Sequence, residues 1–515
     1  MSGRMTHARA TLFLMLTVAA YVQRLAAQCP DGSPPPCGRT VPRGPTATSV
    51  AVLYFDNLAH DTSDAYVADG LTEELITRLG EIQRLQVKSR TAVQRYRGKP
   101  IEDPAALARA LNVLHLVSGT VQQGGGRLRV TVELTRAASG TRVWGQSYER
   151  PATDLMGVEA EIAQAIAEGV GGRLAPSERR SLTVRPSRNP EAYDHYLRGN
   201  YFLARRTPSD ARFAIDQYQK AVALDSSFTA ALARIGYSYG LFLDWGWTYP
   251  GLTWDSVLAR AFFVADRALA LDSNAADVWM TRGYLLSFRN PRTLEGVDAA
   301  FQRAIAKDPR NSEAYHQYGY LLLMGGRDSA AEAMYQRALA LEPERPITLV
   351  TLGFSRHLHG RDNEARTLCD SAIAFVPDAA WAYARRSFWR ARSDVGGALS
   401  DAQTAVRLAP ADYPIEAEAA LAAAEFRSGD TTAARARLAR VAGMFTTGGS
   451  QETYFVSIAL AISGDADGAI ATLRRMMPQG AFQWRIMRDP WFDGIRDDPR
   501  FRALVEASRP PNPEH

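Results

Sequence analysis

Apolar and polar residues change their spacing several times between residues 49 and 174, and each change marks a predicted element. Residues 49–55 form a continuous apolar run, which is typical of a buried strand. Leucines then recur at helical spacing, and three later segments alternate apolar and polar residues as half-buried strands do. Strands are predicted at 49–55, 85–89, 114–122, 127–136 and 142–148, and helices at 69–82, 104–111 and 155–174. The order predicts a compact α/β domain at residues 49–174 with a five-stranded mixed sheet.

Polar residues gather where the first of these helices is expected to begin. They are Asp69, Thr72, Glu73 and Glu74. Carboxylates and hydroxyls at a helix start accept hydrogen bonds from its free N–H groups and face the positive end of its dipole. We therefore expect them to cap the helix. The alternative is that these carboxylates, with Asp64, bind a divalent cation. Capping explains them without a metal, and no cofactor is predicted.

From residue 189 onward the apolar positions keep helical spacing, and small residues return at a fixed interval. Gly319 and Gly353, Ala331 and Ala365, Ala338 and Ala372, and Pro343 and Pro377 each lie 34 residues apart. This period resembles that of the tetratricopeptide repeat, a pair of antiparallel helices that stacks into an all-α superhelical solenoid. Residues 189–486 are predicted to hold six clear repeats and two degenerate ones. We expect the second helices of the clear repeats to end at Ala221, Ala268, Ala304, Ala338, Ala372 and Ala405. In the same register Cys369 falls in the core.

Four strings in the α/β domain resemble the TolB-like amino-terminal domain of bacterial multidomain proteins. They are residues 50–57, 66–75, 96–98 and 143–148. In that family the domain is often joined to tetratricopeptide repeats, and some relatives carry cyclase-like names. The resemblance implies a fold and a bacterial source but little about molecular activity. This sequence shows no paired metal-binding aspartates on strands with a purine-reading residue, and it carries an export signal where relatives carry a DNA-binding or kinase module.

The first 48 residues predict export. Arg4 and Arg9 precede a short apolar run over residues 12–22, and small residues follow, so residues 1–27 are predicted to be a signal peptide. The alternative is an uncleaved anchor. In the Pro-rich linker 28–48, Cys29 and Cys37 enclose a short loop that an oxidising compartment allows to close as a disulfide; the alternative is two free thiols. The predicted location is the periplasm or cell envelope of a bacterium, with no stable membrane span after cleavage.

Charge and the remaining segments refine this picture. The chain has 60 basic and 55 acidic residues, a net charge of +5 that is spread along its length, so no nucleic-acid partner is predicted. Residues 175–188 read as a linker and residues 487–515 as a carboxy-terminal cap and tail. The cap is expected to cover the open core of the last repeat with Trp491, Phe492, Ile495 and Phe501.

The ninth position of each repeat lies on its first helix and is expected to face the concave surface. Aromatic residues hold that position and others stand nearby, and together they are the predicted partner-binding groove: Tyr237, Met280, Tyr284, His316, Tyr320, Val350, Phe354, His357, Trp381 and Phe388. An aromatic strip in a groove suits capture of a peptide segment. The alternative is that these rings pack between successive repeats.

An insertion over residues 241–253 interrupts the second repeat. It holds Trp245, Trp247 and Tyr249, which form either a partner-binding lip or a segment docked on the array. No catalytic or metal-binding residues are predicted. The chain is expected to be an exported, non-enzymatic scaffold that binds proteins or peptides. The alternative is an envelope ligand sensor or enzyme with a site between the α/β domain and the first repeats, and the sequence leaves the oligomeric state open.

Overall fold

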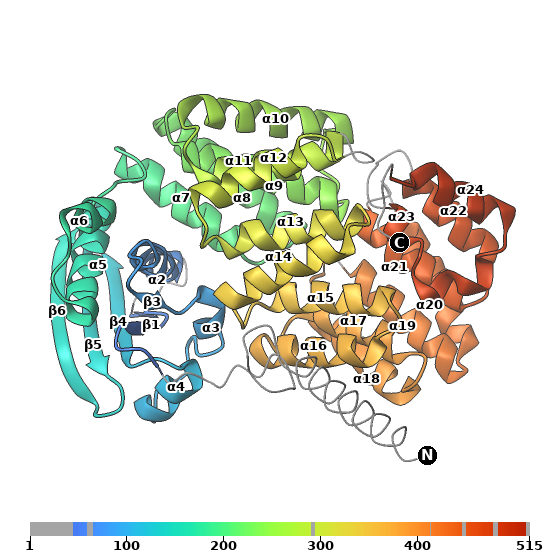
Figure 1. Cartoon of the computed structure of the whole chain (residues 1–515), viewed down its shortest axis with the longest axis horizontal. Helices are drawn as coiled ribbons and strands as arrows, with labels where there is room; N and C mark the ends of the chain where they lie inside the picture. Colours follow the sequence, from blue (N-terminus) through green and yellow to red (C-terminus); the bar gives the residue numbers. More distant parts are fainter. Residues whose placement is uncertain are drawn as a thin grey trace, which may run out of the picture. The chain divides into compact units, whose positions relative to one another are not determined.

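The computed structural model describes residues 45–58, 65–289, 294–411, 414–444, 450–476 and 483–510. The predicted signal peptide and the Cys29–Cys37 pair lie outside these residues. From Ala47 onward the chain forms one compact unit (Figure 1). None of the described helices combines the length and the apolar character that crossing a membrane requires.

The amino-terminal part of this unit, the α/β region, contains a mixed sheet. Its elements are β1 (Ser49–Val52), β2 (Asp56–Asn57), α2 (Ala65–Gly80), β3 (Gln86–Val87), α3 (Arg90–Gln94), α4 (Pro104–Leu111), β4 (His115–Gly124), β5 (Arg127–Arg136), β6 (Thr141–Pro151), the 3-10 turn η2 (Ala152–Asp154) and α5 (Leu155–Gly171). The strand order is β3-β1-β4-β5-β6, and β2 pairs with β4 beside this path. Strand β1 is parallel to β3 and β4, whereas β4, β5 and β6 are antiparallel.

The prediction of a mixed sheet is confirmed, but the predicted strand count was one too low. The two-residue strand β2 pairs with β4 through Asp56 and Asn57, and a segment this short carries no periodicity that a sequence reading can detect. Helix α3 was missed for the same reason. A further helix, α6 (Pro176–Leu182), lies within the predicted linker 175–188.

The sheet is packed on helices through alternating residues. In β5 every second side chain is buried, namely Leu128, Val130, Val132 and Leu134. These side chains share one core with Val158, Ile162 and Ile166 of α5. The other face of β5 is more exposed, as alternation in a half-buried antiparallel sheet requires.

The predicted capping of the first helix is wrong. Helix α2 begins at Ala65, so Asp69 and Glu73 lie inside it and not at its start. The carboxylates instead pair with arginines: Asp69 lies 2.7 Å from Arg97, and Glu73 lies 3.0 Å from Arg90.

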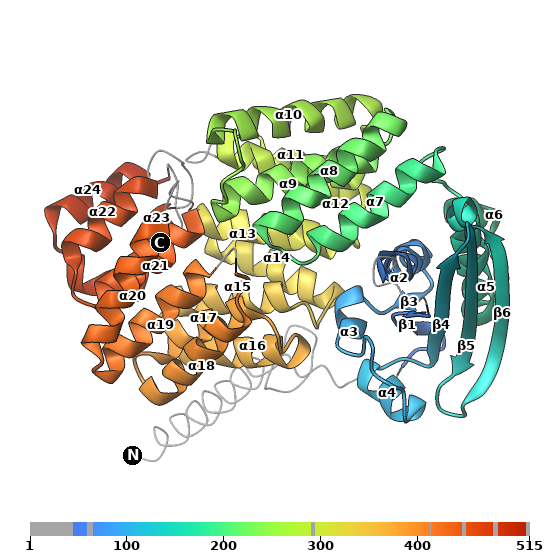
Figure 2. The same cartoon turned by 180° about the vertical axis from the view of Figure 1, so that it is seen from behind.

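After the α/β region in the sequence, the described residues form eight consecutive helix pairs, which we call the array (Figures 1 and 2). The pairs are α7 (Pro190–Leu203) with α8 (Pro208–Leu224), α9 (Thr229–Trp245) with α10 (Trp254–Leu271), α11 (Ala276–Arg289) with α12 (Val297–Lys307), α13 (Ser312–Met324) with α14 (Asp328–Leu341), α15 (Pro346–Leu358) with α16 (Asp362–Phe375), α17 (Ala380–Arg390) with α18 (Val395–Leu408), α19 (Ile415–Ser428) with α20 (Thr431–Met444), and α21 (Ser450–Ile462) with α22 (Ala466–Met476). Three short elements follow: α23 (Gln483–Ile486), η4 (Pro490–Ile495) and α24 (Pro499–Ser508).

Small residues set the spacing within and between these pairs. The six periodic alanines from Ala221 to Ala405 are fully buried, but the second helices end three residues beyond each of them. The reason is that the residue after each helix still donates its N–H to the alanine carbonyl, as Glu342 does to Ala338. Gly319 lies so close to Tyr335 that an added Cβ would stand 2.8 Å from its ring. Cys369 is fully buried, as predicted.

A buried charge cluster joins the α/β region to the array. Arg78 on α2 is 4% exposed and donates hydrogen bonds to the carbonyls of Leu182 and Val184, at 2.8 and 3.0 Å. Its guanidinium also lies 2.7 Å from Glu74 and 3.7 Å from Glu159 of α5. The hydroxyl of Tyr193, on the first helix of the array, donates to Glu159 at 2.8 Å. Arg78 therefore contacts α5 and the segment 182–184 directly, and Glu159 extends the cluster to the array.

We expect Arg78→Ala to lower the free energy of unfolding by about 3 kcal/mol, because removing one partner of a buried pair leaves the other charges without compensation. Urea unfolding followed by circular dichroism measures the change. The matched control is Arg109→Ala, whose side chain is 74% exposed and pairs loosely with Asp103; we expect it to change stability by about 0.5 kcal/mol or less. Equal effects of the two substitutions would contradict the role given to Arg78.

Candidate functional site

A cleft of about 1080 Å³ lies between the α/β region and the first half of the array. One wall is the exposed side of α2 together with the start of α3. The other wall is formed by the first helices of the first four pairs and by the turns that precede α13 and α15. Contacts that join these walls include Lys88 with Glu344 at 3.6 Å and a hydrogen bond from Arg310 to the carbonyl of Leu85 at 3.5 Å.

Charged groups of both signs line this cleft, and many are paired. Arg345 bonds to Glu313 and, at 3.2 Å, to Glu342. Burial opposes the charge of Glu313, but Arg345 and Arg206 outweigh it and hold the pKa of its carboxyl well below the ordinary value. On the other wall, burial raises the pKa of Asp69 to about 6, although Arg97 acts in the opposite direction. The cleft is therefore polar and titratable, with both walls charged.

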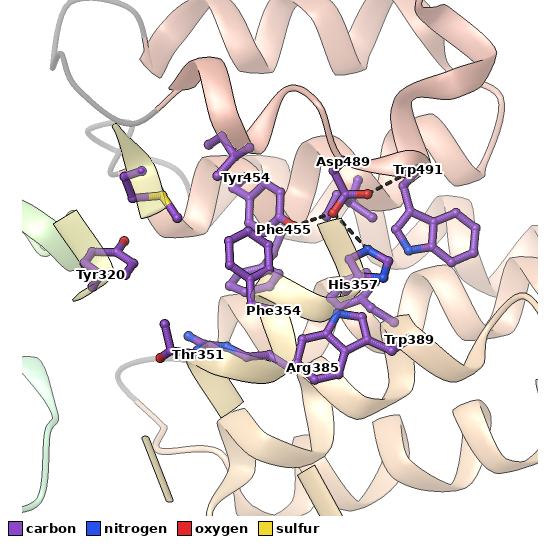
Figure 3. A pocket seen from close by; sticks show the side chains of 14 residues that line it. Tyr320, Thr351, Phe354, His357, Arg385, Trp389, Tyr454, Phe455, Asp489 and Trp491 are labelled. Atoms are coloured by element: carbon purple, nitrogen blue, oxygen red, sulfur yellow. Dashed lines mark hydrogen bonds and ion pairs between the residues drawn. The ribbon is translucent and has the colours of Figure 1, made fainter. Parts of the chain in front are cut away.

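A second, smaller hollow of about 70 Å³ lies within the array (Figure 3). It is lined by side chains of α13, α15 and α17 on one side and of α21, α23 and the cap on the other. Aromatic rings meet across it: Phe354 and Tyr454 have centroids 5.9 Å apart, and Phe388 and Phe455 stack at 5.6 Å. Helix α21 thus covers the middle of the surface that was predicted to be an open groove.

A buried hydrogen-bond network holds the cap against this hollow (Figure 3). Asp489 is fully buried and accepts hydrogen bonds from the Tyr454 hydroxyl at 2.7 Å and the Trp491 amide at 2.7 Å. Its other contact is His357 of α15, whose Nε2 lies 3.1 Å away, while Nδ1 of the same ring lies 2.6 Å from Asp362. Burial alone would lower the pKa of His357, but the carboxylates of Asp489 and Asp362 raise it to about 9. The histidine is therefore charged at neutral pH.

Most of the predicted groove residues are interior. Seven of the ten are 5% exposed or less: Tyr237, Met280, Tyr284, His316, Val350, His357 and Phe388. The alternative interpretation, packing between repeats, describes them, since the rings of Tyr237 and Tyr284 lie 5.7 Å apart. Tyr237 and Met280 also border the cleft, and Tyr320, Phe354 and Trp381 stay partly exposed. Of the ten predicted residues, two therefore border the cleft, three are partly exposed, and the other five are interior.

The aromatic insertion is docked on the array. Helix α9 extends to Trp245, so the connection is shorter than predicted, and Gly246 ends the helix in a left-handed conformation. Trp245 and Trp247 are buried with ring centroids 5.4 Å apart, and Tyr249 packs on Phe242 at 5.2 Å. The lip interpretation is therefore not what the structure shows.

Sequence reasoning missed Tyr454, Phe455 and Asp489 as parts of a site. The cap was expected to cover only the last repeat, and Phe492 and Phe501 are indeed fully buried. The cap also reaches back to α15, where Asp489 contacts His357, and just before the cap Arg485 of α23 bonds to Asp328 of α14. Nothing in the local pattern around Asp489 marks a partner more than a hundred residues away. Among the described residues, no group of three or more His, Cys, Asp or Glu side chains is placed to hold a metal ion.

Comparison with known proteins identifies a tetratricopeptide repeat at residues 300–333. A curated protein, "Putative adenylate cyclase 3" of Rhizobium meliloti (strain 1021), is 28% identical over 247 residues, which are 48% of this chain and 41% of the relative. The chain thus spans about two-fifths of the length of that curated relative.

Solved structures with similar helix arrangements include yeast Tom70, PilF of Pseudomonas aeruginosa and the Cut9–Hcn1 complex. Tom70 is 14% identical, with 69% of this chain and 82% of that chain covered and a TM-score of 0.39. PilF is 16% identical, with 44% and 95% covered and a TM-score of 0.33. Cut9–Hcn1 is 13% identical, with 68% and 65% covered and a TM-score of 0.44.

The His357 network predicts a pH-dependent stability. The pKa of this histidine is about 9 when folded and about 6.5 when unfolded, so its contribution is fully present below pH 6.5 and is lost as the pH rises to 9. The loss is at most about 3 kcal/mol. Asp489 acts oppositely, because its lowered pKa makes its contribution disappear only in acid.

Urea unfolding of the wild type and of His357→Gln between pH 6 and about 9.5 checks this prediction. The difference in stability between the two proteins is expected to shrink steadily over that range. Titrating groups that do not interact with His357 are common to both proteins, so their contributions cancel in the difference. A difference that is the same at both ends of the range would show that His357 does not carry the pH dependence.

Proposed function

We propose that this protein is a non-enzymatic scaffold that binds a segment of a partner protein in the cleft between the α/β region and the array. The observation that carries the proposal is the cleft itself. Its volume of about 1080 Å³ lies at or above the upper end of the range typical of small-molecule pockets, about 300–1,000 Å³. Its walls combine tyrosines with paired charges, which suit an extended chain bearing both apolar and charged side chains.

The tetratricopeptide repeat supports the same proposal, because arrays of such repeats present extended concave surfaces. Here the cleft includes the part of that surface that α21 leaves uncovered. In this proposal residues 49–174 are a TolB-like domain, residues 189–486 are the repeats and residues 487–515 are the cap.

A second candidate function is a ligand sensor or enzyme that uses the same cleft. The observation that favours it is the presence of titratable groups with shifted pKa values on both walls, such as Asp69 and Glu313. The name of the curated relative belongs to that protein, of which this chain matches 41%. We favour the scaffold because these two carboxylates already have partners: Asp69 pairs with Arg97, and Glu313 bonds to Arg345 and Tyr237.

The cleft is tested by filling it from either wall. Thr77 on α2 and Ala204 at the end of α7 are both exposed and both line it, so Thr77→Trp and Ala204→Trp narrow the cleft without disturbing the core. We expect each to weaken partner binding about tenfold or more. The partner is first identified by photo-crosslinkers placed at these two positions in the native cell, and its affinity is then measured by calorimetry.

The matched control is Gln403→Trp, an exposed position on α18 outside the cleft. It is expected to leave affinity unchanged. If Thr77→Trp and Ala204→Trp retain the partner, the scaffold proposal fails at this site. The sensor is the better explanation if both variants keep every protein partner but a small molecule that raises the melting temperature of the wild type no longer raises theirs.

We further propose that the chain is exported to the cell envelope of a bacterium, on the strength of the apolar run at residues 12–22. Residues 1–48 fused to a reporter that is active only outside the cytoplasm are expected to give activity. The matched control, Leu16→Arg, breaks the apolar run and is expected to abolish it, because a charge opposes transfer into the bilayer. Activity that survives this substitution would argue against the signal.

A further inference from the structure

The strand β6 forms a long edge of the sheet. It spans eleven residues, and its only neighbour among the described strands is β5. Most of its residues are exposed or half-buried, with Tyr148 the exception. A long edge presents a row of backbone N–H and C=O groups and is a template for pairing with another strand. The opposite edge strand, β3, is only two residues long.

A bulge in β6 places two opposite charges on one face of this edge. Leu134 pairs with Trp144 and Thr135 pairs with Arg142, so Val143 is left without a partner on β5. Because of this extra residue, the side chains on the two sides of the bulge no longer follow one odd–even alternation between the two faces of the sheet. Arg142 therefore shares the solvent face with Glu149, which pairs with Arg129, while Trp144 and Tyr148 share the face that packs on the core.

With this arrangement of faces, β6 is complementary to itself. Two antiparallel copies that meet with Gln146 opposite Gln146 place Gly145 opposite Ser147 and Trp144 opposite Tyr148. When Val143 is looped out as it is against β5, the next pair is Arg142 opposite Glu149. Each of these pairs joins residues of the same face, as direct cross-strand pairs must. Because of the two-fold symmetry, the Arg142–Glu149 pair and the Trp144–Tyr148 pair each occur twice.

We propose that β6 pairs with the β6 strand of a second copy of this chain, joining two sheets into one. The charge pattern selects this register. A shift by two residues in either direction places Arg142 opposite Ser147 or Pro151, so the arginine loses its carboxylate. Proline also lacks the N–H that a ladder needs. Opposite charges across an interface set register and partner choice more than raw affinity.

The groups that take part are accessible for this pairing. Glu149 is 49% exposed and contacts Arg127 and Arg129, and Arg142 is 58% exposed and lies 3.5 Å from Glu133. Exposed pairs of this kind contribute little to folding, so their rearrangement costs little. The edge is short, and interfaces at the small end, below about 1,200 Å² in total, are usually weak and transient. We therefore expect a reversible dimer.

Charge reversal tests the proposal. In the full chain, Arg142→Glu and Glu149→Arg each bring like charges together at both pairs, and each is expected to weaken dimerisation about tenfold or more in sedimentation velocity. The double variant restores opposite charges and is expected to dimerise like the wild type. A mixture of the two single variants is expected to form the heterodimer, because each then faces its opposite charge. Arg109→Glu, an exposed substitution on α4, is the control for altered net charge.

A second measurement reports the register directly. In Gln146→Cys two copies bring the introduced thiols opposite each other, and mild oxidation is expected to join the new thiol of one copy to that of the other, as peptide mass spectrometry detects. Arg109→Cys is the matched control. A wild type that stays monomeric at all concentrations would overturn the proposal. So would single variants that dimerise as well as the wild type, or a double variant that fails to recover.

Discussion

An array of helix pairs leaves an apolar face uncovered at each of its ends, and covering those faces is the constraint on which this structure depends. At the amino-terminal end the cover is the α/β region. Its core continues without interruption into the first two helix pairs, where Tyr193, Leu197 and Phe228 belong to the same buried cluster as the sheet. At the other end the cover is the cap, with Phe492 and Phe501 fully buried. The two covers explain why the whole chain from Ala47 forms one unit.

Both covers are fixed by buried charges and not by apolar contact alone. At the first junction Glu159, which faces Arg78, accepts a hydrogen bond from Tyr193 of the array, and at the second His357 meets Asp489. Transferring such groups from water is expensive, so an apolar replacement of similar volume is often neutral or stabilising. What a buried pair adds is a geometric condition, because an apolar surface tolerates sliding whereas a charge needs its partner at one position. We hypothesise that the charges select the position of each cover. The pH dependence of the His357 contact tests this hypothesis for the cap.

Local patterns predicted much of this fold, and long-range contacts explain what they did not. The 34-residue spacing of residues such as Gly319 and Gly353 depends only on neighbouring helices, so the helix pairs were predictable. The strands of the sheet were predictable because β5 alternates along its length. The environment of Phe388 was not, because a first-helix ring is exposed only if nothing returns to cover it. Here α21 and the cap return, and no local feature of Asp489 records its contact with His357.

The same closure explains why the cleft is a better binding site than the rest of the concave surface. A partner that entered beside Phe354 and Phe388 would first have to displace Tyr454 and Phe455. Each aromatic contact contributes about 0.5–1.5 kcal/mol beyond the area that it buries. The displaced helix is also tethered, so its effective concentration is in the range of about millimolar or more, and a free partner must exceed that. The cleft beside α2 requires no such displacement, since its charged walls are already formed and open. Binding there uses the whole of the interaction free energy, which is the physical reason to assign the partner to the first half of the array.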